Sequence, residues 1–153
     1  MTRTVLAAFL AAGAAALPAS AATTQRFSAD LHDNVSCPGV DLCGKGLVHG
    51  FGTATTTLTF TSFGPGPGNC AAVTAERSIT LDRDGSTLQL AIVGVLCPKG
   101  NPNGEAAGSG TFTVAGGTGI FAGATGSGLL SAQATGVPGP SDTAHYDGTI
   151  TLP

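Results

Sequence analysis

The stretch GTFTVAGGTGIFAGATGSG at residues 110–128 says more about the fold than any other part of the chain. Its first residues alternate apolar and polar side chains, which predicts a strand over 109–115 with Phe112 and Val114 on the buried side. A pair of glycines ends that strand, and the adjacent apolar residues that follow break the alternation. We therefore expect a single helical turn over 118–124 that packs under one end of a sheet.

The same glycines match the spacing of a dinucleotide-binding fingerprint, but the helix and the acidic residue that this fingerprint requires are missing. Gly117-x-Gly119-x-x-Ala122 follows a strand, but that fingerprint must open a helix and be followed by an acidic residue about 20 positions later. Three glycines directly downstream prevent a long helix here. The sequence therefore predicts that this segment does not bind a nucleotide, and we expect no other cofactor either.

Period-two alternation continues outside this stretch, as is typical of half-buried strands. In the longest segment the apolar phase shifts at Gly50 and Gly52, which predicts either a bulge or a break in the strand. Seven or eight strands with regular turns favour an all-β antiparallel barrel or sandwich. The expected strands cover residues 27–32, 45–63, 70–81, 86–97, 109–115, 128–135 and 146–152, with loops at 64–69, 98–108 and 136–142.

Two cysteines lie at the far ends of two adjacent expected strands. If Leu81 pairs with Ser86 across the turn 82–85, the same register places Cys70 opposite Cys97. Directly opposed strand residues are close enough for a disulfide, so we predict a Cys70–Cys97 bond. The register also forms one apolar face from the pairs Ile79 with Leu88, Ala75 with Ile92 and Val73 with Gly94.

The other two cysteines, Cys37 and Cys43, are then left to close a small loop around Pro38-Gly39. An even number of cysteines in an exported chain indicates a disulfide framework. The spacings of the four cysteines lack the paired C-x2-4-C knuckles of a zinc site, so we expect no metal.

The composition restricts the class of protein. A length of 153 residues fits one domain, and an apolar share of 42% argues against disorder. Only 10% of the residues are charged, against about 25% in typical globular domains. Nucleic-acid-binding proteins usually carry a basic patch, whereas this chain has a net charge of −3. We therefore expect no nucleic-acid partner.

Residues 1–22 have the pattern of a secretory signal peptide, which leaves 23–153 as a single β-barrel domain. Arg3 supplies the positive start, residues 5–17 the apolar segment, and Ala19-Ser20-Ala21 a small-x-small cleavage site. The apolar segment is shorter than the roughly 20 residues that a membrane span needs. We therefore expect a secreted protein without stable membrane insertion after cleavage.

Residues 110–128 resemble the G-x-F-x-x-x-G-G-T-G-x-F-x-G-A-x-G segment of the allene oxide cyclase and dirigent superfamily. They also resemble small exported actinobacterial barrel proteins without an assigned activity. The resemblance implies a calycin-like barrel of about eight antiparallel strands. The plant cyclases act on a hydrophobic fatty-acid epoxide inside the barrel, but none of their functional positions aligns with this chain outside the glycine-rich segment.

Arg77 falls on the apolar face of the hairpin, opposite Leu90. In a barrel interior it would bind a ligand carboxylate or pair with an acid such as Glu76 or Asp30. The alternative, which we favour, is a bulge that turns the side chain outward or a long stem that reaches the rim. Arg77 is thus one candidate ligand-binding residue.

His49 is the second candidate ligand-binding residue. It shares the parity of Leu47 and Phe51, so we expect it to point inward, as a ligand contact or, more simply, as a hydrogen-bonded core residue. His32 and His145 fall in the polar phase of their strands and are expected to face solvent.

These observations favour a secreted barrel that binds a small hydrophobic ligand or serves as a structural module of the envelope. The alternative is a cyclase or isomerase that acts on a hydrophobic small molecule by positioning it. A weaker alternative is a protease inhibitor, based on the loop Cys97-Pro98-Lys99-Gly100. No catalytic motif such as G-x-S-x-G is present, but an enzyme that works by positioning does not need one. Export argues against an enzyme, because biosynthetic intermediates are usually cytosolic, so we lean towards a protein that is not an enzyme. Nothing in the sequence indicates which oligomeric state the protein has.

Overall fold

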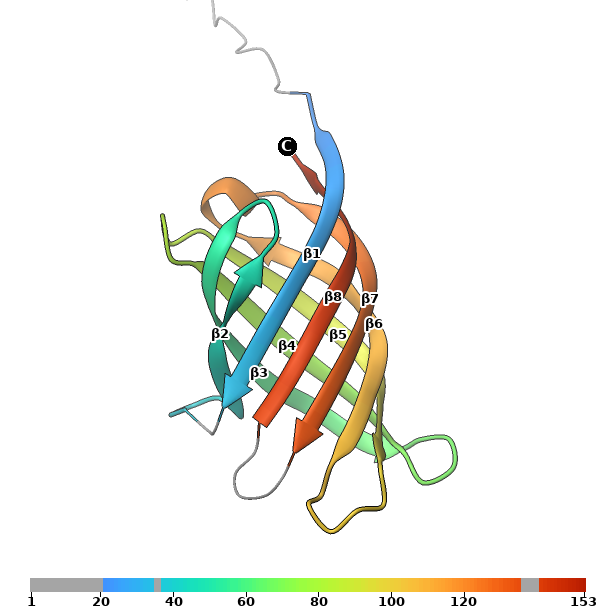
Figure 1. Ribbon diagram of the computed structural model, residues 1–153. Coiled ribbons are helices and arrows are strands. Elements are labelled where there is room, and N and C mark those ends of the chain that lie inside the picture. The colour runs from blue at the N-terminus through green and yellow to red at the C-terminus, as the bar shows by residue number, and fades with distance from the viewer. Residues whose placement is uncertain (1–20, 35–36, 136–140) are drawn as a thin grey trace, which may run out of the picture.

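The structure is a computed structural model, and it describes residues 21–34, 37–135 and 141–153. These residues form a closed antiparallel barrel in which each strand pairs with its neighbours in sequence and β8 returns to pair with β1 (Figure 1). The strands are β1 (Thr23–Asn34), β2 (Leu42–Val48), β3 (Gly52–Pro65), β4 (Ala71–Leu81), β5 (Thr87–Pro98), β6 (Ala106–Gly117), β7 (Thr125–Thr135) and β8 (Ser141–Leu152).

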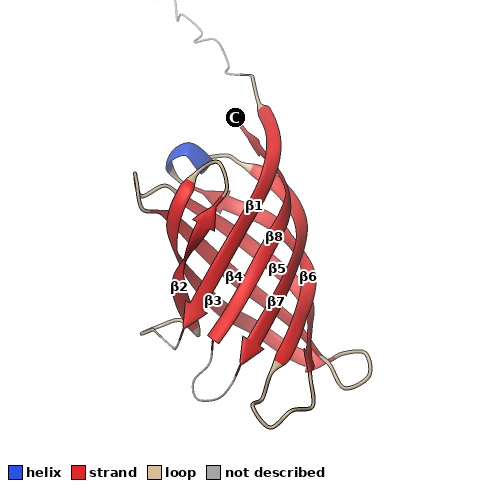
Figure 2. Cartoon of the chain, in the orientation of Figure 1, coloured by secondary structure: helices blue, strands red, loops and turns tan. Residues whose placement is uncertain are grey.

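The barrel confirms the predicted fold class. Figure 2 shows strands throughout, with one short helical element in the described chain. That element is the 3₁₀ turn η1 (Gly119–Phe121), within the predicted residues 118–124. The β4–β5 register is also as predicted, because Ile79 lies opposite Leu88 and Ala75 lies opposite Ile92. Strands β7 and β8 begin earlier than expected, because the first residue of each pairs with the far end of the other: Thr125 with Thr151, and Ser141 with Thr135.

One end of the barrel is closed by apolar side chains beneath η1. The Phe51 and Phe121 rings lie 5.1 Å apart at this end, and Phe121 is only 1% exposed. Gly117 makes this closure feasible, because a Cβ there would lie 2.7 Å from the Cβ of Phe121. Other side chains of the core, all on the inner face, include Phe27, Val48, Leu81, Leu88, Phe112 and Ile150.

Both predicted disulfides are present, and both lie at the opposite end of the barrel. Cys70–Cys97 joins the start of β4 to the end of β5, with the Cα atoms 4.1 Å apart. Cys37–Cys43 closes the loop that leads into β2. Two disulfides are typical of proteins in oxidising compartments.

The long segment predicted at 45–63 is broken rather than bulged at its glycines. A tight turn with the bond from the Phe51 amide to the Val48 carbonyl separates β2 from β3. The register shift that β3 does contain lies farther on, between Phe60 and Ser62.

Part of the predicted leader at 1–22 and of the turn at 136–142 lies outside the described residues. Within the described ranges, no helix has the length and apolar character needed to cross a membrane.

Candidate functional site

The open half of the barrel contains a cavity of about 370 Å³, at the end that carries the disulfides. Small-molecule sites typically measure roughly 300–1,000 Å³, so this volume is sufficient for a small ligand. Its wall is mostly apolar, because the inward positions of β3, β4, β5 and β7 carry aliphatic and aromatic residues. Lining residues include Leu58, Phe60, Phe63, Val73, Ile92, Leu96, Leu130, Ala132 and Ala134.

Arg77 reaches the cavity from β4 and is 1% exposed. Its Nη1 donates to Asp33 Oδ2 at 2.6 Å and to Thr56 Oγ1 at 2.8 Å. Its Nη2 donates to Asp142 Oδ2 at 3.3 Å. The two carboxylates come from β1 and β8, so the guanidinium joins three strands that are distant in sequence. We call Asp33, Arg77 and Asp142 the buried ion cluster.

Tyr146 contacts both the buried ion cluster and the apolar core of the barrel. The Cζ atom of Arg77 lies 5.6 Å from the centroid of the Tyr146 ring, which is cation–π range. The same ring packs edge-on against Phe112 of the apolar core, at a centroid distance of 5.6 Å. Burial raises the pKa of Tyr146 to about 12, so its hydroxyl stays protonated at neutral pH.

The buried ion cluster carries more negative than positive charge. One guanidinium faces two carboxylates, which leaves one net negative charge when both are ionised. Burial raises the pKa of Asp142 to about 6; the charge of Asp33 adds to this rise, while Arg77 opposes it. Asp142 lines the cavity and therefore changes protonation close to neutral pH.

Three buried polar atoms of the cluster have no hydrogen-bond partner among the described residues. They are Oδ1 of Asp33, Nε of Arg77 and Oδ1 of Asp142. Buried polar groups normally have partners, and an unpaired one is costly. The two acceptors outnumber the single donor, so the cluster is better suited to receiving hydrogen bonds than to donating them.

Arg77 therefore lies in the interior, where the alternation placed it, and the favoured outward position is wrong. Its partners are also different from those expected, since Glu76 and Asp30 point away from the interior and are exposed. The sequence did contain the signal for the true partners. Asp33 continues the inward phase of Phe27, Ala29 and Leu31, and Asp142 has the parity of the buried Ala144 and Tyr146.

His49 does not point into the barrel, which corrects the second candidate. The parity argument failed because the turn after β2 lies between Leu47 and Phe51. Leu47 is 43% exposed and Val48 is the buried residue, so odd-numbered positions face outward up to His49, and Phe51 is buried only because the turn reverses the phase after His49. The His49 side chain lies on the outer surface, 49% exposed.

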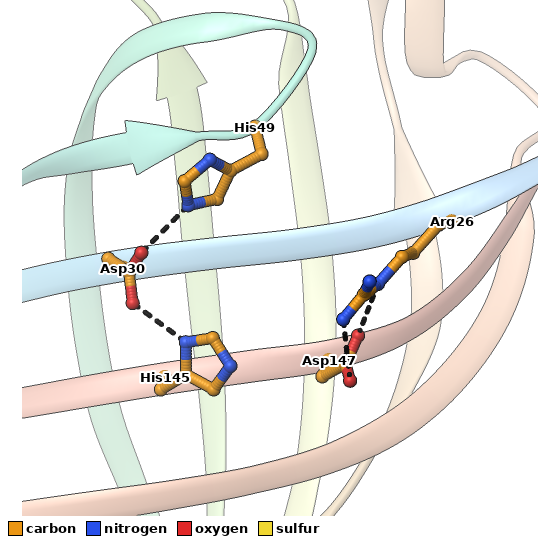
Figure 3. A network of polar contacts seen from close by, with 5 residues as sticks. All are labelled: Arg26, Asp30, His49, His145 and Asp147. Atoms are coloured by element: carbon orange, nitrogen blue, oxygen red, sulfur yellow. Dashed lines mark hydrogen bonds and ion pairs between the residues drawn. The ribbon is translucent and has the colours of Figure 1, made fainter.

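On that surface His49 belongs to a second polar network (Figure 3). Its Nε2 lies 2.7 Å from Asp30 Oδ2, and His145 Nδ1 lies 2.7 Å from Asp30 Oδ1. The hydrogen bonds with His49 and His145 lower the pKa of Asp30. Beside them, Arg26 and Asp147 form an exposed ion pair with Nε and Oδ1 3.0 Å apart. His32 and His145 are exposed, as predicted.

Other predicted features are placed as follows. In the loop proposed for protease inhibition, the Lys99 ammonium lies 3.7 Å from Glu105 Oε2. Across residues 21–34, 37–135 and 141–153, no three His, Cys, Asp or Glu side chains gather in a way that could hold a metal ion.

No family model and no curated protein matches the chain. Among solved structures, the chain is similar to the pterocarpan synthase dirigent protein GePTS1, with 14% sequence identity and a TM-score of 0.42 over 90% of this chain and 89% of that one. A likeness at this identity and TM-score assigns neither a family nor an activity. The resemblance to dirigent proteins, allene oxide cyclases and exported actinobacterial barrels therefore stays a prediction from residues 110–128.

Proposed function

We propose that this protein is exported and binds a small, mainly apolar molecule in the open half of its barrel. The observation that supports this most directly is the cavity of about 370 Å³ with an apolar wall and one polar group of residues at its inner end. A site of this kind gains affinity from burial of apolar surface and orientation from a few polar contacts.

The polar end of the ligand is a hydrogen-bond donor. Arg77 already pairs with two carboxylates, so it has little capacity left to bind the ligand carboxylate that the sequence analysis considered. Asp142 lines the cavity and retains an oxygen without a partner among the described residues. A hydroxyl or amine on the ligand would supply the missing donor.

Export is part of the proposal. Two disulfides favour an oxidising compartment, and the pattern of residues 1–22 is that of a signal peptide. An extracellular location would give the barrel access to ligands outside the cell.

The chain provides its own reporter for the test, because it contains one tyrosine and no tryptophan. That tyrosine is Tyr146, which lines the cavity. We expect octanol to change the intrinsic tyrosine fluorescence in a saturable way, and native mass spectrometry of the exported protein to detect a copurified small molecule.

A matched pair of variants on β7 locates the binding. Ala132→Phe fills the cavity and should abolish the octanol response, whereas Ser131→Phe adds the same ring on the exposed side of the strand and should preserve it. A folded protein that gives no response to octanol and carries no copurified molecule would leave the structural module as the better reading.

One observation favours a second function, an isomerase or cyclase acting on a hydrophobic molecule. Asp142 has a pKa of about 6 and lines an apolar cavity, so it can accept and return a proton at neutral pH. The test is the conversion of an apolar β,γ-unsaturated ketone into its conjugated isomer, in which a proton leaves the α carbon and returns at the γ carbon. Turnover that is lost in Asp142→Asn while binding persists would support catalysis, and absence of turnover in the native protein would remove this candidate.

A further inference from the structure

We propose that the ligand of this cavity is an apolar amine, bound as its ammonium ion with the charged end toward Asp142. This inference rests on the proposed binding function and narrows it to one class of ligand. Its basis is the balance of charge around the cavity.

Acidic groups outnumber basic groups at both ends of the cavity. Among the described residues that line it, the charged ones are Arg77 and Asp142 at the inner end and Asp41 near the mouth. Asp33 stands behind Arg77, with the guanidinium between it and Asp142. Around the cavity there are therefore three carboxylates and one guanidinium, and a cationic ligand would reduce this imbalance whereas an anionic one would increase it.

The inner end is where a ligand charge has the largest effect. Asp142 is 7% exposed, and its contact with Arg77 is the longer of the two ion pairs, at 3.3 Å against 2.6 Å for Asp33. Arg77 therefore neutralises the negative charge of Asp142 less completely than that of Asp33. Charge-assisted hydrogen bonds are roughly twice as strong as neutral ones, so an ammonium would gain more there than a hydroxyl.

The mouth of the cavity also favours a cationic ligand, but more weakly. Asp41 Oδ2 accepts a hydrogen bond from the Phe60 amide at 2.7 Å, and the residue is exposed to solvent. An exposed carboxylate attracts a cation from solution but adds little to the final affinity, because water screens it. We therefore expect Asp41 to assist entry and Asp142 to select the bound ligand.

The apolar wall restricts the amine to one with a hydrophobic body. A polyamine would place its further charges against Phe60, Phe63, Leu130 and other apolar residues, at a high desolvation cost. A single ammonium on an alkyl or aryl skeleton matches both parts of the site.

The experiment compares three ligands with the same chain and different ends: octylamine, octanol and octanoate. Tyr146 fluorescence and calorimetry measure their affinities at about pH 8, where an alkylamine, like the lysine side chain, is still protonated. We expect octylamine to bind at least about tenfold more tightly than octanol, which is the ratio given by 1.4 kcal/mol. Octanoate should bind most weakly.

Two variants assign the preference to the inner end. Asp142→Asn should reduce octylamine binding to the level of octanol while octanol binding changes less than about twofold. Glu76→Gln removes a carboxylate that is adjacent to Arg77 in sequence but exposed on the outer face, and should change neither affinity.

A pH series makes the test independent of any variant that fails to fold. Asp142 faces Arg77 from β4, Asp33 from β1 and Tyr146 on its own strand, and its pKa is about 6. Octylamine affinity should therefore fall as the pH is lowered through about 6, whereas octanol affinity should stay constant. Equal affinities for all three ligands, or the tightest binding by octanoate, would overturn the amine while leaving an apolar binding site. Failure of all three to bind would overturn the proposed function itself.

Discussion

The two ends of this barrel are built from the same eight described strands but are held together in different ways. At the closed end, apolar side chains such as Phe51 and Phe121 fill the interior beneath η1. At the open end, the interior contains a cavity and a buried ion cluster, and both disulfides lie there.

The difference indicates a division of labour between packing and cross-links. A cavity forfeits the contacts that a filled core provides, so the open end needs another source of stability. Disulfides act chiefly by restricting the unfolded chain, typically by about 2–4 kcal/mol each, and they take up no interior space. The open end can therefore keep a hollow interior without unfolding from that end.

Arg77→Met gives the largest expected effect at the open end. Removing the guanidinium leaves Asp33 and Asp142 buried without their partner, which should lower the free energy of unfolding by about 3–5 kcal/mol in urea titrations. The triple variant Asp33→Leu, Arg77→Met, Asp142→Leu should recover most of that loss, because no charge remains buried. A loss below about 1 kcal/mol for Arg77→Met would mean that the open end does not depend on the ion cluster.

A pair of phenylalanines compares the ends directly. Phe121 is 1% exposed at the closed end, and Phe63 is 61% exposed at the mouth of the cavity. Phe121→Ala should lower the free energy of unfolding by about 3–5 kcal/mol, since it opens a cavity in the packed core. Phe63→Ala should cost less than about 1 kcal/mol, as for other exposed side chains. Similar losses for both variants in thermal or urea unfolding would contradict the distinction between a packed end and a hollow one.

The pH dependence of stability tests the charge at the open end. The pKa of Asp142 rises from 3.8 to about 6 on folding, so the folded state binds more protons than the unfolded state between these values. Stability should therefore decrease as the pH rises from about 4 to 7, by an amount on the order of 3 kcal/mol. Asp142→Asn should remove this slope. An unchanged slope in that variant would assign the effect to another group.

The smallest effect on stability is expected on the outer surface of the barrel, at the network of Asp30, His49 and His145. Because the hydrogen bonds with His49 and His145 lower the pKa of Asp30, their contribution is present above about pH 4 and is lost as the pH falls through the lowered pKa. All three side chains are about half exposed, so Asp30→Asn should cost less than about 1 kcal/mol at neutral pH. A loss as large as that of Arg77→Met would show that burial does not determine the strength of these two networks.

Local patterns were sufficient for most of the fold. Alternation predicted the strands, the sum of paired positions predicted the β4–β5 register, and that register predicted Cys70–Cys97. The prediction for His49 was wrong because a tight turn reversed the phase between Leu47 and Phe51, and parity cannot be carried across a turn. Gly50 and Gly52 predict either a bulge or a break, and the structure has the break.

The candidate site was accessible only in part. Inward parity marked Arg77 alone, because a side chain's face follows from its own strand and Asp33 and Asp142 lie beyond the expected strands 27–32 and 146–152. Their meeting at one point depends on the closure of β8 onto β1 and on the stagger of strands across the barrel, which no single strand encodes. The cavity has the same origin, since its volume is the space left when eight inner faces come together and their side chains do not fill one end.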